Sequence, residues 1–170
     1  MKWIVLCLLL LSTSTAKAEL VIKLDEPVVS HEVSGTLEEV DKKIRDATAK
    51  PKPNYPSSAW TNFSYNLNGK TITLFCGIHV PVWKNRDKAS KKDQALWDNF
   101  YKVVYYHELH HLKIARVFMQ AAADKIDKLS NETDMVNTLN FHWSEMHKAH
   151  IEYDRAFSMD PGYVYPNGTH

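Results

Sequence analysis

Apolar and polar residues alternate along two parts of the first half of the chain, which predicts strands. Residues 20–33 alternate loosely and are interrupted by a proline, so we expect one or two short strands there. Residues 59–67 alternate around aromatic side chains, and residues 71–83 are rich in β-branched and apolar residues. Asn68-Gly69 lies between the last two stretches and favours a tight hairpin turn. The pattern therefore predicts a small antiparallel sheet that contains a hairpin.

Apolar residues recur at the three- and four-residue steps of a helix in three other stretches. Thr36 and Glu39 form a capping box that opens a short helix, which should end before Pro51. A second capping box at Ser90 opens a long helix that runs to about residue 129, and another long helix covers about residues 135–158. We therefore expect an α+β fold in which a small antiparallel sheet packs against two long helices, preceded by a shorter one.

The two ends of the chain have a different character from its middle. Residues 1–18 combine an early lysine, a short apolar run and a small-x-small site that ends at Ala18, which is typical of a secretory signal peptide. Residues 19–160 are expected to form a single domain, and residues 161–170 a loose tail. No later segment is apolar enough to span a bilayer, so we expect no stable membrane insertion after cleavage. The sequence predicts a secreted or periplasmic protein.

Charge and cysteine content exclude several classes of protein. The formal net charge is only +1, so nothing indicates a nucleic-acid partner. Cleavage of the signal peptide would leave Cys76 as the one cysteine, and a single cysteine cannot form an internal disulfide. Cys76 lies in the apolar strand pattern, so we expect a buried and unreactive thiol. The oligomeric state stays open at this stage.

The clearest chemical pattern is His107-Glu108-Leu109-His110-His111, which falls in the first long predicted helix. Residues four apart lie one turn apart on the same helical face, so His107 and His111 can both bind one zinc ion. Glu108 projects to the side of that pair, where it can act as the general base for a water molecule at the metal. The sequence therefore predicts a zinc-dependent hydrolase.

A catalytic zinc ion normally has three protein ligands and one open position, so a further ligand must come from elsewhere. His150 and Asp154 lie four residues apart on the apolar face of the last predicted helix. An imidazole or carboxylate on such a face needs a polar partner or a metal. The two residues are therefore alternatives for the third ligand, and the one that does not bind would contact the ligands.

The chain resembles a bacterial domain-of-unknown-function family described as secreted zinc-dependent proteases. The resemblance covers most of the chain after residue 18 and rests on four segments: Ser34-Gly35-Thr36-Leu37-Glu38-Glu39, the strand residues 59–65, the motif helix at residues 107–115, and Tyr153-Asp154. It implies a peptidase that uses zinc and acts on a peptide or protein substrate. The family pattern continues with Thr-x-His-Gly, whereas here the stretch is Phe157-Ser158-Met159-Asp160. A ligand from that element is therefore absent.

The motif and the resemblance together favour an exported metallopeptidase. Its expected residues are His107 and His111 as ligands, Glu108 as base, and Asp154 or His150 as third ligand. Two alternatives remain at this stage. One is a non-catalytic zinc-binding module of the cell envelope, and the other is a zinc hydrolase of a cell-wall amide or ester.

Overall fold

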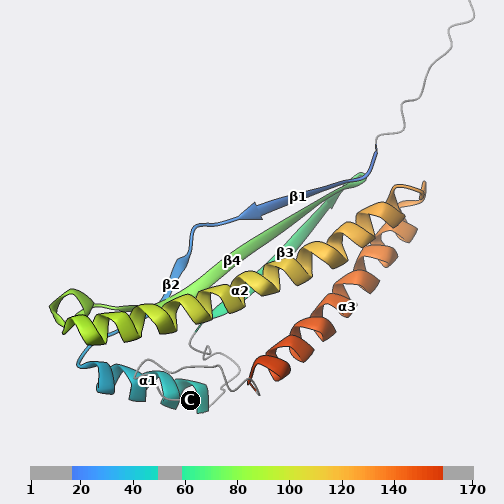
Figure 1. The fold of residues 1–170 in the computed structure, drawn as a ribbon. Coiled ribbons are helices and arrows are strands. Elements are labelled where there is room, and N and C mark those ends of the chain that lie inside the picture. Colours follow the sequence, from blue (N-terminus) through green and yellow to red (C-terminus); the bar gives the residue numbers. More distant parts are fainter. Residues whose placement is uncertain (1–16, 50–58, 159–170) are drawn as a thin grey trace, which may run out of the picture.

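The structure is a computed structural model that describes residues 17–49 and 59–158. Within them the chain forms strands and helices in this order (Figure 1): β1 (Glu19–Leu24), β2 (Val28–Val33), α1 (Leu37–Ala49), β3 (Trp60–Asn68), β4 (Thr71–Trp83), the 3-10 turn η1 (Arg86–Lys88), α2 (Lys91–Ile126) and α3 (Glu132–Ser158). The predicted tail and all but the last two residues of the predicted signal peptide lie outside the described residues.

β4 is the central strand of the sheet. β3 pairs with it antiparallel from Trp60 to Asn68, which confirms the predicted hairpin. β1 pairs with residues 71–76 of β4 and β2 with residues 79–83, and both run parallel to it. The expectation of an antiparallel sheet is therefore wrong for these two strands. Parallel pairing needs a long crossover connection, which α1 and the chain up to β4 provide.

The helices confirm the predicted α+β class. In α1, the backbone N–H of Thr36 donates to the Glu39 carboxylate, and the N–H of Glu39 donates to Thr36 Oγ1. Ser90 caps α2 by accepting a hydrogen bond from the N–H of Asp93 at 3.1 Å. α3 begins three residues before its predicted start, because the Asn131 side chain accepts a hydrogen bond from the N–H of Thr133. α2 lies along the sheet, and α3 lies beside α2 (Figure 1).

Two clusters of buried apolar side chains hold these elements together. The first joins α1, the beginning of α2 and one end of β4; its members are Val33, Leu37, Val40, Ile44, Ala59, Cys76, Ile78, Val80, Trp83, Trp97, Phe100 and Val104. The second joins the rest of α2 to α3 and the other end of β4; its members are Ile72, Leu74, Ala115, Met119, Ala122, Ala123, Ile126, Met135, Leu139 and Met146. Between the clusters, Glu108, His111 and His150 are buried polar residues, here called the seam.

Cys76 belongs to the first cluster and confirms the expectation of a buried thiol, since it is 1% exposed. The pKa of the Cys76 thiol is raised to about 11, mainly by burial and also by the charges of Asp25 and Glu108. The thiol therefore stays protonated at neutral pH and is a poor nucleophile.

Gly35 precedes α1 in a backbone conformation that favours glycine, with φ of +120°. A Cβ atom at this position would overlap the Glu39 carboxylate that caps the helix. We therefore expect Gly35→Ala to lower the free energy of unfolding by about 1–3 kcal/mol, measured by urea denaturation. Gly69→Asn is the control, because Gly69 has φ of +56°, which asparagine tolerates, and open space around its Cβ position. Equal losses in the two variants would contradict this account.

Candidate metal centre

α2 carries all three residues of the predicted motif. His107, Glu108 and His111 lie in the middle of this helix, at the break between the two apolar clusters. The side chains of His107 and His111 are only 11% and 9% exposed. Their Nε2 atoms are 3.1 Å apart, so the one-turn spacing directs both imidazoles at the same point.

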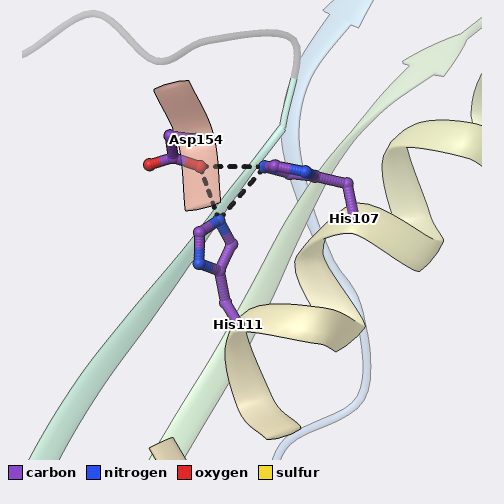
Figure 2. Close-up of side chains that lie close together, drawn as sticks. All are labelled: His107, His111 and Asp154. Atoms are coloured by element: carbon purple, nitrogen blue, oxygen red, sulfur yellow. Dashed lines mark hydrogen bonds and ion pairs between the residues drawn. The ribbon is translucent and has the colours of Figure 1, made fainter. Parts of the chain in front are cut away.

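α3 brings Asp154 to the same point (Figure 2). Asp154 Oδ1 lies 3.0 Å from His107 Nε2 and 2.8 Å from His111 Nε2. Figure 2 shows the two imidazoles of α2 and the carboxylate of α3 converging on one another. The structure thus brings together three of the predicted site residues, which are separated by up to 47 positions in the sequence.

This donor set suits zinc. Imidazole nitrogen and carboxylate oxygen bind Zn²⁺ at about 2.0–2.2 Å, so two atoms that share a tetrahedral ion lie about 3.3 Å apart. The three atoms here are separated by 2.8–3.1 Å, within a few tenths of an ångström of that spacing. Small movements of the side chains would allow all three atoms to bind one ion.

His150, the alternative to Asp154 in the sequence, lies on the opposite side of His111. Its Nδ1 is 2.9 Å from His111 Nδ1, the imidazole nitrogen that faces away from Asp154. His150 is 8% exposed, and its ring stacks on Phe63 of β3 with ring centroids 5.1 Å apart. The pKa of His150 is lowered to about 4, mainly by burial and also by the charges of His111 and His147, against the opposing charge of Asp154. His150 is therefore neutral at neutral pH.

Glu108 is buried between α2 and β3, with an exposed fraction of 4%. Thr61 of β3 donates a hydrogen bond from Oγ1 to Glu108 Oε2 at 2.8 Å. Burial raises the pKa of Glu108, against the hydrogen bond from Thr61 and the nearby charges of His107 and His111. The carboxyl group is therefore held in one orientation and has a greater affinity for a proton than an exposed glutamate has.

Asp154 has the opposite electrostatic environment. Desolvation acts to raise its pKa, but the hydrogen bonds and charges of His107 and His111 outweigh it and hold the pKa well below the usual value. The carboxylate is therefore ionised at neutral pH, as a metal ligand must be. Its side chain is 56% exposed, so the three-residue cluster borders on solvent at this residue.

Two aromatic rings of α3 pack against His107. The Tyr153 ring stacks on His107 with centroids 4.8 Å apart, and it also stacks on His110 at 4.5 Å. The Phe157 ring lies 4.1 Å from His107. These contacts restrict the rotation of the His107 imidazole, which helps to keep Nε2 directed at the cluster.

Thr61 and Phe63 contact the site, although the sequence did not single them out. Both lie on β3, far along the chain from α2 and α3. One signal was available, since the alternation of β3 places Thr61 on the same face as the half-buried Phe63, Tyr65 and Leu67. A hydroxyl among inward-facing aromatic and aliphatic residues needs a polar partner, and Glu108 is that partner.

Comparison with known proteins gives one match. A family model described as a bacterial protein of unknown function (DUF922) matches residues 28–162, which is more than half of the chain. No curated protein and no solved structure matches the chain. The matched region contains all of the site residues named above.

Proposed function

The chain belongs to the DUF922 family of bacterial proteins of unknown function, and we propose that it is an exported zinc-dependent hydrolase of the metallopeptidase type. One observation carries the proposal. Three groups that can bind zinc converge within 2.8–3.1 Å of one another, next to a buried glutamate whose pKa is raised. Perturbed carboxyl groups beside a candidate metal site are typical of catalytic centres.

His107 and His111 would hold the zinc ion through Nε2, and Asp154 through Oδ1. Zinc supplies Lewis acidity, which lowers the pKa of a water molecule and polarises the substrate carbonyl. Glu108 would accept a proton from the attacking water on Oε1, while Thr61 holds Oε2. As the C–N bond breaks, Glu108 would donate that proton to the leaving amine nitrogen.

The environment of Glu108 suits this role in proton transfer. A general base is most effective when its pKa lies near the working pH, and an ordinary glutamate is too acidic for that. Burial in the seam raises the pKa of Glu108 above that of an ordinary glutamate, in the direction that a general base needs. The hydrogen bond from Thr61 fixes the carboxylate plane, so the free oxygen faces a constant direction.

The partial exposure of the cluster favours a catalytic rather than a structural metal. Structural zinc sites are closed by four protein ligands, whereas catalytic sites keep one open position. Among the described residues, three groups form the only cluster whose ligand atoms could hold a metal, and the Asp154 side chain in it is 56% exposed. A substrate carbonyl could approach from that side.

Export is part of the proposal and rests on the signal-peptide pattern of residues 1–18. None of the helices in the described part of the chain is both long and apolar enough to cross a membrane. The proposed location is the periplasm or the extracellular space, and the proposed substrate is a peptide or protein.

Metal removal tests the proposed function directly. We expect the purified protein to contain one zinc ion per chain by elemental analysis and to cleave members of a broad peptide library, followed by mass spectrometry. Dialysis against a chelator should abolish cleavage, and added zinc should restore it, because the metal supplies the Lewis acid. Bound zinc without cleavage of peptides or of cell-wall amides and esters would contradict a hydrolase and favour a binding module.

A further inference from the structure

His111 makes contacts through both of its ring nitrogens. Nε2 lies 2.8 Å from Asp154 Oδ1, within the candidate metal centre, and Nδ1 lies 2.9 Å from His150 Nδ1. Both histidines are more than nine-tenths buried, so water has little access to this pair. The ring nitrogen that carries the proton in one histidine therefore depends on the tautomer of the other.

Only one proton can lie between the two Nδ1 atoms. A neutral imidazole carries its single proton on one nitrogen and has a lone pair on the other. A metal at Nε2 of His111 needs that lone pair, which requires the proton to be on Nδ1. Nδ1–H of His111 must then donate to Nδ1 of His150, so the proton of His150 must be on its Nε2.

We infer that His150 is a positioning residue, which accepts this hydrogen bond and so holds His111 in the tautomer that leaves Nε2 free for the metal. The inference rests on the proposed metal site and assigns a role to a residue that touches neither metal nor substrate. Contacts of this kind orient a ligand ring and increase its basicity. Usually the acceptor is a carboxylate or a backbone carbonyl, whereas here it is a second neutral imidazole.

The surroundings of His150 support a role beyond packing. Phe63 stacks on its ring at an interplanar angle of 12°, which sets the direction of Nδ1. Its Nε2 is buried and has no hydrogen-bond partner among the described residues. A buried polar atom without a partner lowers stability, so an apolar ring would serve better if packing were the only requirement. Compared with an apolar ring, the imidazole of His150 provides a hydrogen-bond acceptor at Nδ1.

Two variants separate the acceptor from the ring. His150→Phe keeps an aromatic ring to stack on Phe63 but cannot accept a hydrogen bond. His150→Asn loses the ring but has a side-chain oxygen near the position of Nδ1. When zinc takes Nε2 of His111, the proton of that ring moves to Nδ1, and in a variant without an acceptor this buried N–H has no partner.

The first test is zinc affinity, measured by competition with a chromophoric chelator. We expect His150→Phe to bind zinc about 10- to 100-fold more weakly than wild type, and His150→Asn to recover most of that loss. In the metal-free state, His150→Phe should have a melting temperature close to that of wild type, because it removes one buried nitrogen without a partner, Nε2 of His150, and leaves another, Nδ1 of His111. Unchanged zinc affinity in His150→Phe would overturn the inference.

The second test needs no catalysis. Long-range ¹H–¹⁵N correlation spectra of the zinc-loaded protein distinguish the two tautomers of each histidine. In wild type we expect the proton of His111 on Nδ1 and that of His150 on Nε2, so that Nδ1 of His150 accepts the hydrogen bond. A zinc-loaded wild type in which His150 carries its proton on Nδ1 would overturn the inference whether or not either variant folds. Absence of zinc binding by wild type would instead count against the proposed function, so the two failures are distinguishable.

Discussion

Glu108→Gln is expected to lower kcat for peptide hydrolysis by about 100- to 10,000-fold, the usual contribution of a general base. Glutamine has the same shape as glutamate and can accept the hydrogen bond that Thr61 donates to Oε2. It cannot accept a proton from water at neutral pH. The loss should therefore appear in kcat, with little change in KM, because the side chain acts in the transition state rather than in substrate binding.

Zinc content distinguishes loss of the base from loss of the site. Glu108 is not one of the three converging groups, so Glu108→Gln should retain one zinc ion per chain. Glu152→Gln is a matched control, because Glu152 is an exposed glutamate on α3, and it should keep wild-type kcat. Equal rates for Glu108→Gln and wild type would rule out Glu108 as the base.

Asp154→Ala is expected to weaken zinc binding by more than about 100-fold, which exceeds the usual 10- to 100-fold effect of residues that only contact a ligand. Asp154 is the one carboxylate in the cluster, and it is ionised at neutral pH because His107 and His111 lower its pKa. Its removal deletes both a ligand and the negative charge that attracts the cation. The measurement is competition with a chromophoric chelator at constant pH.

The control for this substitution is Glu152→Ala, which removes an exposed carboxylate two positions away on α3 and should leave the affinity unchanged. Because Glu152→Ala and Asp154→Ala each remove one negative charge, this control shows how much of any loss of affinity comes from net charge alone. Wild-type affinity in Asp154→Ala would contradict its assignment as third ligand and would return His150 to that position. His150→Phe would then lose zinc more completely than the positioning role predicts.

Local patterns account for the parts of this protein that could be predicted from the sequence. The capping boxes at Thr36 and Ser90, the Asn68-Gly69 turn and the stripe of α2 each depend on residues that are close in the chain. The four-residue spacings of His107 with His111 and of His150 with Asp154 are also local patterns of this kind. Helical geometry alone places each of these pairs on one face.

Relations between distant segments could not be predicted in the same way. The alternation in residues 20–33 is compatible with either strand direction, so it did not reveal that β1 and β2 run parallel to β4. The face of α3 that carries His150 and Asp154 was identified, but not which of them meets Nε2 of His111. That choice depends on how far α3 is displaced along α2, which the packing of Met135, Leu139 and Met146 determines. The contact between Thr61 and Glu108 depends on how α2 lies on the sheet.

The seam between the two apolar clusters has a consequence for the mechanics of the chain. The last α3 residue in either cluster is Met146. Beyond it, His150, Tyr153 and Asp154 make contacts with His107 and His111 of α2. The final turns of α3 are therefore fastened to α2 largely by the imidazoles and the carboxylate themselves. An ion bound there would stabilise the packing of α3 on α2 in addition to its role in catalysis. A ligand that binds the folded chain and not the unfolded chain raises the free energy of unfolding. Metal binding should therefore stabilise this end of the helix pair more than the rest of the domain.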